Sequence, residues 1–429
     1  MMEQIFIIGG SNEALNTAIV MASLDRKVTV ICSQKQIQDT LQHYCFERQM
    51  VSLWHLYTKE QKIQINEEVS ATLGQIKNDE TFLSATFWLF LDTLDINDRQ
   101  PILAVINHPN CKTVLSGVCD IGAANNMAAA LATPYVFYLP FIFIKDGMNF
   151  SSLLQPEFVV LGEKTPNSYL ECDAVSFFVN QSQQNHVTDI KTAEFSRNTI
   201  MTMLATRLSL MNELSRLADQ LNVDITQVEN IVGKDPRIGK DYLSAGWGFG
   251  GKTLPNELLR LTHTFQQCNI KSSLIQKVMA INEDQKELIF RKFWRHFDGF
   301  IEHKTVVIWG AGYRSGTGRT TASAIHPLLK LLWSYHIKTW VYAHNTKDEL
   351  LEYYSGHPLF ELCDDAYAPL QSAHALFIIN WSLPMKPNVT ALNRIALPIF
   401  DAKNVLEKQQ ISQLIGDYIG IGYKKEGSI

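Results

Sequence analysis

The densest run of glycine in the chain lies between residues 246 and 251, where Gly246, Gly248, Gly250 and Gly251 occupy four of the six positions. Glycine has no Cβ atom, so a main chain this rich in glycine can approach a ligand closely or enter a tight turn. A hydroxyl, Thr253, and a carboxylate, Glu257, follow the run. A threonine hydroxyl without an adjacent base is a poor nucleophile, and Glu257 also suits a solvent-facing position at the start of a helix. The segment therefore predicts either a ligand-binding loop or a tight turn.

A second glycine turn opens the chain. Gly9, Ser11 and Ala14 fall at the three small-residue positions of the dinucleotide pattern G-x-G-x-x-G/A. Ser11 takes the position where glycine lets main-chain amides approach a pyrophosphate, and its side chain would crowd a phosphate there. Cys32 and Ser33 stand where an acidic residue would bind the ribose hydroxyls, although Ser33 and a nearby lysine suit a 2′-phosphate. The turn leaves three readings open: NAD binding, NADP binding, or a Rossmann-like domain that has lost its dinucleotide.

Composition indicates an ordinary globular protein. The chain has 429 residues, of which 46% are hydrophobic and 19% are charged, a length typical of two or three domains. Its net charge of -5 gives no basic surface for nucleic acid. The apolar stretch 135–144 is interrupted by Pro140 and is too short to span a bilayer, and no basic leader precedes the first apolar run. We expect a cytoplasmic protein with no nucleic-acid partner and no membrane partner.

The seven cysteines are scattered along the chain. They form no C-x-x-C pair and have no neighbouring histidine at ligand spacing. We therefore expect reduced thiols and no metal site.

The elements that would position these residues alternate between strand and helix at both ends of the chain. Short apolar runs predict strands at 5–8, 27–31, 102–106, 158–161, 305–309, 339–342 and 375–379. Helical spacing without glycine or proline predicts one long amphipathic helix over 192–221, with more helix after 224 and over 275–297. We predict an α/β fold with two Rossmann-like parallel-sheet domains joined by a central helical domain. The predicted domains are residues 1–185, 190–298 and 300–429.

Segments throughout the chain resemble the UDP-glucose/GDP-mannose dehydrogenase family. Residues 235–257 resemble its substrate and nucleophile loop, and further motifs match at 147–162, 193–213, 310–323, 373–381, 401–404 and 418–422. The resemblance covers nearly the whole chain and implies an NAD-dependent nucleotide-sugar 6-dehydrogenase fold. It implies that a UDP-type sugar is bound by Arg237, Tyr242, Leu243, Gly248, Gly250, Gly251 and Arg314.

At the catalytic positions of that family, this chain has other residue types. Thr253 replaces the cysteine that holds the sugar carbon as a thiohemiacetal and then a thioester. Arg197 and Met201 replace a lysine and an asparagine, and arginine is no proton shuttle while methionine donates no hydrogen bond. Ile142 replaces the glutamate that manages the hydrolytic water. Glu257 in place of an aspartate is the one conservative change among these five positions.

These substitutions predict a catalytically degenerate family member that still binds a nucleotide sugar, in polysaccharide-related metabolism. The reason is that catalytic groups acting together lose nearly all of their rate enhancement when one of them is removed. Two alternatives stay open. One is an active NAD(P)-dependent oxidoreductase with altered chemistry, and the other is a non-catalytic partner subunit of an active paralogue.

The long helix also predicts a homodimer, the arrangement that the resemblance implies. Its apolar spacing leaves more hydrophobic surface than one packed face needs. The residues that carry this prediction are Met203, Leu204, Leu208, Leu210, Met211 and Leu214.

Overall fold

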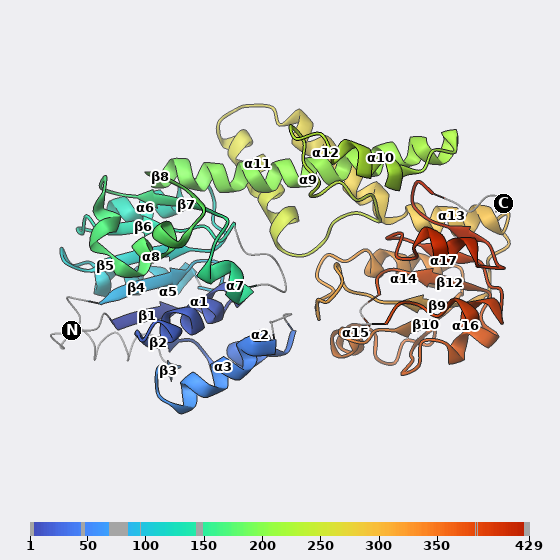
Figure 1. Cartoon of the computed structure of the whole chain (residues 1–429), viewed down its shortest axis with the longest axis horizontal. Helices are drawn as coiled ribbons and strands as arrows, with labels where there is room; N and C mark the ends of the chain where they lie inside the picture. Colours follow the sequence, from blue (N-terminus) through green and yellow to red (C-terminus); the bar gives the residue numbers. More distant parts are fainter. Residues whose placement is uncertain are drawn as a thin grey trace. The chain divides into compact units, whose positions relative to one another are not determined.

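The chain forms two compact units, Met1–Ile200 and Met201–Ile429, here called the first and the second unit. The computed structural model describes residues 4–43, 48–67, 85–94, 96–142, 149–381, 383 and 385–423. Each unit has a sheet of mostly parallel strands covered by helices (Figure 1). The predicted α/β class with two Rossmann-like sheets is therefore confirmed.

Within the described residues, the first unit forms an eight-stranded sheet in the order β3-β2-β1-β4-β5-β6-β7-β8. Its strands are β1 (Gln4–Ile8), β2 (Lys27–Ile31), β3 (Ile63–Asn66), β4 (Thr86–Phe90), β5 (Lys112–Ser116), β6 (Val136–Tyr138), β7 (Phe158–Glu163) and β8 (Gln184–Asp189). The first six follow the doubly wound order of dinucleotide-binding sheets. Neighbouring strands are parallel except for β6 and β7, which pair antiparallel.

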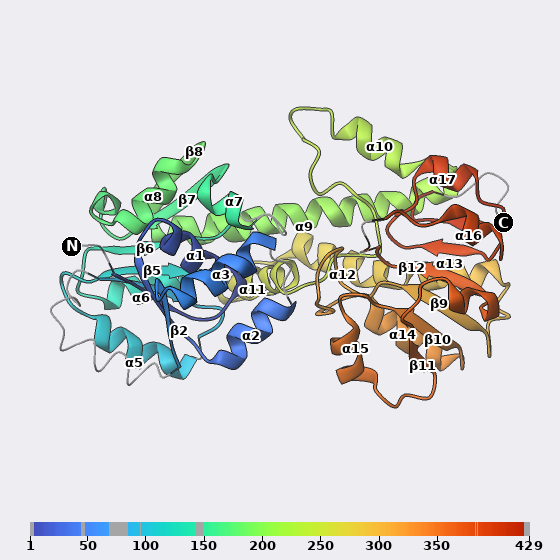
Figure 2. The same ribbon diagram turned by 60° about the horizontal axis from the view of Figure 1, so that its bottom comes forward.

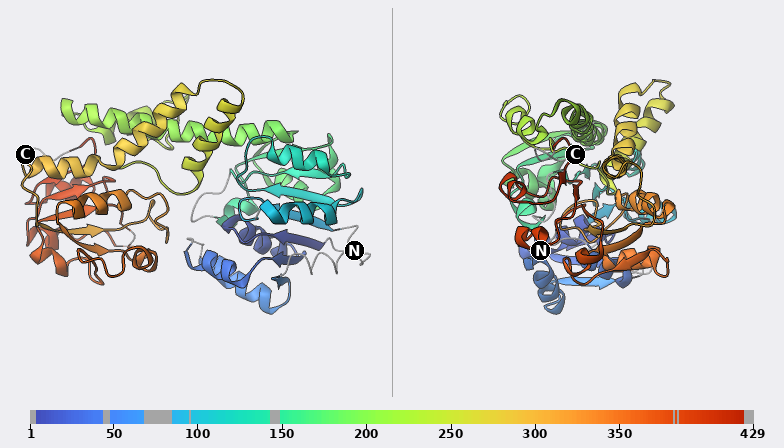
Figure 3. Two further views of the ribbon diagram at one scale, coloured as in Figure 1. Left: turned by 180° about the vertical axis from the view of Figure 1, so that it is seen from behind. Right: turned by 90° about the vertical axis from the view of Figure 1, so that its right-hand side faces the viewer.

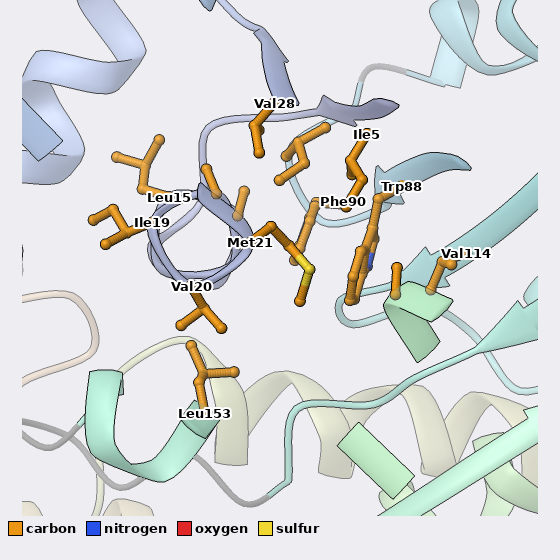
Figure 4. Close-up of a cluster of buried hydrophobic side chains, with 14 of the residues drawn as sticks. Ile5, Leu15, Ile19, Val20, Met21, Val28, Trp88, Phe90, Val114 and Leu153 are labelled. Carbon is orange, nitrogen blue, oxygen red and sulfur yellow. The ribbon is translucent and has the colours of Figure 1, made fainter. Parts of the chain in front are cut away.

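Helices cover both faces of this sheet. They are α1 (Asn12–Ser23), α2 (Gln34–His43), α3 (Arg48–Lys59), α5 (Ile96–Ile106), α6 (Ala123–Ala130), α7 (Asn149–Leu154), the 3-10 helix η2 (Ser168–Glu171) and α8 (Asp173–Gln181). Helix α1 is buried along most of its length. Its Met21 lies against Phe90 and Trp88 of β4, and its Val20 faces Leu153 of α7 (Figure 4). This packing holds α1 against the sheet.

The predicted strand at 102–106 is wrong, because these residues form the second half of α5. Only Ile102 and Ile106 of this run are buried, one helical turn apart, while Ala104 is exposed. A short apolar run cannot by itself distinguish a buried strand from a helix. The predicted strands at 5–8, 27–31 and 158–161 are confirmed as β1, β2 and β7.

The predicted long helix is confirmed as α9 (Ile190–Leu221). It is followed by α10 (Ile225–Val232), α11 (Thr253–Gln267), α12 (Ser273–Lys286) and α13 (Leu288–His296). The helix predicted over 275–297 is therefore two helices, with a turn at Glu287 whose amide bonds to the Asp284 carbonyl at 3.3 Å. In the second unit, α12 lies beside α9 (Figure 3), and Ser209 of α9 donates to the Val278 carbonyl of α12 at 3.0 Å.

The second sheet repeats the same strand order, β11-β10-β9-β12-β13-β14, with all described pairs parallel. Its strands are β9 (Thr305–Trp309), β10 (Lys338–Tyr342), β11 (Phe360–Leu362), β12 (Ala375–Ile378), β13 (Ile399–Asp401) and β14 (Tyr418–Ile419). Its helices are α14 (Ile325–Ser334), α15 (Lys347–Tyr354), η3 (Ala368–Ser372), α16 (Val389–Asn393) and α17 (Lys408–Ser412). One face packs on α13, α14 and α15 and the other on η3, α16 and α17 (Figure 2).

In the part of the chain that the structure describes, none of the helices combines the length and the apolar character that a membrane span requires.

Candidate functional site

The glycine-rich loop of residues 246–251 is held in place by three buried amide side chains of the second unit. Asn212 accepts from the Gly246 amide at 2.9 Å, and Gln285 donates to the Gly246 carbonyl at 2.7 Å. Asn282 accepts from the Phe249 amide at 2.7 Å and donates to the Phe249 carbonyl at 3.1 Å. All three amide residues are at most 2% exposed. Buried hydrogen bonds of this kind preorganise the loop, because breaking any of them leaves a polar group without water.

The glycines of this loop are required by contacts with the protein itself. A Cβ atom at Gly250 would lie 2.6 Å from the Ala322 carbonyl oxygen and 2.9 Å from Tyr313 Cβ. Gly251 has φ +78° and meets the Tyr313 ring, and Gly248 has φ +93° and meets Asn282. The tight-turn reading therefore has a physical basis in the packing of the loop against residues 310–323. Contact of Gly248, Gly250 and Gly251 with a ligand stays a prediction.

Thr253 is the first residue of α11, and its side chain is exposed. Among the described residues, none forms a hydrogen bond with its hydroxyl, so no base is in place to activate it. Glu257 lies one turn further along and is 1% exposed. The interpretation of Glu257 as a solvent-facing residue is therefore wrong, because its side chain is buried.

The proposed substrate-binding side chains differ in their exposure. Arg237 projects into solvent, and its guanidinium pairs with Asp235 at 2.7 and 3.0 Å. Tyr242 has φ +59° and is 44% exposed, and partial burial raises the pKa of its hydroxyl. Leu243 is 4% exposed and belongs to the hydrophobic core, so only its main chain can meet a ligand. Arg314 is exposed on the segment that packs against the glycine loop.

Lys403 is a site residue that the sequence analysis did not select. A Cβ atom at Gly246 would lie 3.0 Å from Lys403 Cδ and 3.3 Å from its Nζ, so the ammonium group borders the loop. The turn that carries it is held by buried hydrogen bonds. Asp401, which is fully buried, accepts from the amides of Lys403 and Leu406 and from the Tyr418 hydroxyl, each at 3.0 or 3.1 Å. The sequence did contain a signal for this residue, because Lys403 is a cation at the third position of the 401–404 motif.

In the first unit, Arg197 belongs to a buried polar cluster on α9. It is 8% exposed, and the nearby Glu194 accepts from the amides of Ala124 at 2.7 Å and Gly122 at 3.1 Å at the start of α6. The Cys119 thiol lies 3.6 Å from Glu194, and burial raises the pKa of that thiol to about 12, partly opposed by the charge of Arg197. Such a thiol stays protonated and is no substitute for the missing nucleophile.

The two other positions that the resemblance predicts to be catalytic carry apolar side chains. Ile142 is partly buried and packs against both hydrophobic clusters of the first unit. Met201 is half-buried at the start of the second unit. Neither side chain can accept or transfer a proton. Ile142 and Arg197 belong to the first unit, whereas Met201, Thr253 and Glu257 belong to the second.

The first glycine turn keeps the shape of a dinucleotide-binding turn but not its chemistry. Gly9 has φ +126°, and Ser11 is the N-cap of α1, where its hydroxyl accepts from the Ala14 amide at 3.2 Å. Cys32, which follows β2, is 5% exposed, and burial raises the pKa of its thiol to about 11. A neutral thiol cannot replace the carboxylate that holds the ribose hydroxyls. The residues present therefore do not fit NAD, while Ser33 and Lys35, which suit a 2′-phosphate, are both exposed.

Within the described ranges, no group of three or more His, Cys, Asp or Glu side chains is arranged to hold a metal ion.

Comparison with known proteins places these features in context. Residues 191–284 match the UDP-glucose/GDP-mannose dehydrogenase family, central domain. The UDP-glucose 6-dehydrogenase of Pseudomonas aeruginosa is 27% identical over 295 residues, which are 66% of this chain and 64% of that protein, just under two thirds of its length. The enzyme of the same name from Rickettsia conorii is 25% identical over 339 residues, 75% of this chain and 76% of that protein.

Solved structures resemble the chain over its whole length. A UDP-glucose dehydrogenase from the hyperthermophilic archaeon Pyrobaculum islandicum matches with a TM-score of 0.83, at 17% identity, over 99% of this chain and 98% of that one. A UDP-D-ManNAc dehydrogenase from Pyrococcus horikoshii matches with a TM-score of 0.78, at 16% identity, over 98% and 99% of the two chains. At these identities the likeness establishes the fold alone.

Proposed function

Because this chain belongs to the UDP-glucose/GDP-mannose dehydrogenase family, we propose that it is a member that binds a nucleotide sugar and no longer oxidises it. The ligand class is a UDP-type sugar, and the setting is polysaccharide-related metabolism. Binding and catalysis use different residues, so one can persist after the other is lost.

The observation that carries the binding half of the proposal is the preorganised loop of residues 246–251. Its three amide clamps belong to the second unit and need no ligand to hold their geometry. Lys403 and Arg314 lie on two segments beside the loop and supply the positive charge that a diphosphate requires. Main-chain amides and cations together can bind an anion, and Tyr242, four residues before the loop, is 44% exposed.

Loss of the oxidation reaction follows from Thr253. A thiolate adds to an aldehyde and later leaves as a thiol, whereas a neutral hydroxyl with no base does neither at a useful rate. Replacing that one group would suffice to stop thioester formation. Arg197, Met201 and Ile142 remove the proton shuttle, the hydrogen-bond donor and the water-handling carboxylate that complete the family's reaction.

Isothermal titration calorimetry tests the binding half directly. UDP-glucose, UDP-N-acetylglucosamine, GDP-mannose, NAD and NADP are titrated side by side into the full chain. We expect saturable heat from at least one UDP-sugar. The affinity should be weaker than that of an intact family site, because Gly318 and Thr321 stand where the resemblance implies charged residues. Absence of saturable heat from all three sugar nucleotides would overturn the proposal.

We also propose that the chain acts as a homodimer built on α9. Five of its apolar side chains remain between 38% and 63% exposed in the second unit: Met203, Leu210, Leu214, Leu217 and Leu221. Successive members are separated by seven, four, three and four residues, so they share one face of the helix. Of the other residues in this prediction, Met211 is 2% exposed and Leu204 and Leu208 are partly buried, so these three pack within the chain. Single exposed leucines are common on monomeric proteins, but a continuous row of exposed apolar side chains is not. Such a row, here called the α9 stripe, fits packing against the same helix of a second copy of the chain.

A further inference from the structure

The ligand crevice of a doubly wound sheet lies at the carboxyl ends of the strands where the strand order reverses. In the first unit this point lies between β1 and β4, and the first glycine turn, residues 9–12, follows β1 there. A dinucleotide bound at this crevice would have to touch the main chain of the turn, because the pyrophosphate is held by its amides.

Helix α2 packs directly on this turn. Thr40 donates its hydroxyl hydrogen to the Gly10 carbonyl at 2.6 Å and is 4% exposed. The Gln36 side chain covers Gly10, since a Cβ atom there would lie 3.1 Å from Gln36 Cγ and Cδ and would overlap the Cys32 sulfur. Cys32 and Gln36 also contact each other, with 3.0 Å between Sγ and Oε1. The side chains of Cys32 and Gln36 therefore occupy the space over the Gly10 Cα, while Thr40 binds its carbonyl.

The other side of the turn is closed by the end of β4. A Cβ atom at Gly9 would lie 2.5 Å from Thr93 Oγ1 and 3.0 Å from Phe90 Cβ. Gly9, Gly10, Ser11 and Asn12 are all buried, and Ser11 is 8% exposed. The Ser11 hydroxyl already accepts from a first-turn amide of α1, the kind of amide that would otherwise face a phosphate.

From these contacts we propose that the first unit has closed its dinucleotide crevice with its own second helix and accepts neither NAD nor NADP. To admit a pyrophosphate, the unit must break the hydrogen bond between Thr40 and Gly10, withdraw Gln36 and displace the Ser11 hydroxyl from its cap. An intact site makes a dinucleotide's contacts without any of these costs. The first unit is then a packed scaffold that keeps the Rossmann topology for its stability. This inference concerns the first unit alone and does not depend on nucleotide-sugar binding by the second.

Calorimetry on the unmodified full chain is the primary test. NAD and NADP, each raised to millimolar concentration, are expected to give no saturable heat. Saturable binding of either would overturn the proposal, whatever the sugar nucleotides do. The sugar-nucleotide titrations report on the second unit, so the two proposals fail separately.

Alkylation of Cys32 tests the closure itself. Iodoacetamide labelling is followed for each cysteine by peptide mass spectrometry, with the exposed Cys268 as the internal standard for reagent. Gln36→Ala removes the covering side chain and is expected to raise the labelling rate of Cys32 several-fold. Gln38→Ala removes an exposed glutamine from the same helix and is expected to leave that rate unchanged.

Cys172 separates opening of the crevice from unfolding, because it is 0% exposed in the same unit and reacts only when the unit unfolds. Equal Cys32 labelling rates in the two variants, with Cys172 protected in both, would overturn the assignment of Gln36 as the cover. A rise confined to Cys32 in Gln36→Ala would support it. If Gln36→Ala unfolds, the calorimetry on the unmodified chain still decides the proposal.

Discussion

Asn282 satisfies both polar groups of the Phe249 main chain, accepting from its amide at 2.7 Å and donating to its carbonyl at 3.1 Å. One side chain on α12 therefore fixes the middle of the glycine-rich loop, as a paired strand residue would. Since Asn282 is 2% exposed and Phe249 is 7% exposed, water cannot take over either bond.

Asn282→Ala should loosen the loop and lower the stability of the second unit. The substitution leaves a buried amide and a buried carbonyl without partners, so we expect the free energy of unfolding to fall by about 2–4 kcal/mol. Urea denaturation measures this, and calorimetry should show loss of UDP-sugar binding. Gln276→Ala, an exposed position on the same helix, is the matched control and should behave like the wild type. A stable Asn282→Ala variant with unchanged ligand affinity would contradict the role of the clamp.

Lys403→Ala should weaken the binding of UDP-sugars without unfolding the protein. A charge-assisted hydrogen bond contributes about 1.5–3 kcal/mol, so the dissociation constant should rise by about tenfold to a hundredfold. Calorimetry gives the affinity, and a melting curve checks the fold. Lys271→Ala removes an exposed lysine of the same unit and serves as the control. Equal affinity in both variants would show that Lys403 does not reach the ligand.

The wild-type protein should not convert UDP-glucose to UDP-glucuronate with NAD. Thr253→Cys alone should not restore turnover, because Arg197, Met201 and Ile142 leave the proton-transfer and hydrolysis steps without their groups. NADH absorbance is followed against a heat-inactivated sample. Steady NADH formation by the wild type would favour an active oxidoreductase with altered chemistry, and formation by Thr253→Cys alone would show that the nucleophile was the one missing group.

Acid should erase the stabilising effect of Asp284, the residue next to the loop clamp Gln285. The hydrogen bond from Arg291, at 2.6 Å, and the nearby Arg216 hold the pKa of Asp284 below its ordinary value. A carboxylate with a lowered folded-state pKa stabilises the fold above the unfolded pKa of about 3.9 and loses this effect as the pH falls through the folded value. The melting temperature of Asp284→Asn should therefore lie below that of the wild type at neutral pH.

As the pH falls below about 4, the two melting temperatures should converge. Asp241→Asn, which removes an exposed carboxylate with no ion pair among the described residues, should melt with the wild type at every pH. A difference between Asp284→Asn and the wild type that does not change with pH would rule out this ion pair as the cause.

Leu210→Glu should convert the proposed homodimer into monomers. Leu210 is 53% exposed at the centre of the α9 stripe, where a glutamate would place a charge in a desolvated contact. Sedimentation equilibrium at micromolar concentration measures the mass of each protein. Leu351→Glu on α15, a position 39% exposed outside the stripe, should leave the mass of the wild type unchanged. A wild-type mass equal to one chain would contradict the dimer outright.

The sequence by itself determined the fold class and the long helix. The α/β alternation at both ends and the glycine-free helical spacing over 192–221 are local signals, and they survive in any tertiary context. Local signals also located both glycine turns, whereas the positions predicted to be catalytic rested on the family resemblance alone. Local signals were wrong at 102–106, because a short apolar run is compatible with both a strand and a helix. They also did not identify β4, because its residues Thr86–Phe90 are buried on both faces and show no alternation of apolar and polar residues.

Tertiary structure decided what surrounds each candidate residue. Asn212, Asn282 and Gln285 reach the glycine loop from 33 to 39 residues away in the sequence. Gln36 and Thr40 of α2 reach Gly10 across the helix α1 and the strand β2. The burial of Glu257 and the position of Lys403 beside Gly246 depend on the same long-range packing. Residue types and spacing determine which chemistry is available, but hydrogen bonding and exclusion of water depend on neighbours that only the folded chain brings together.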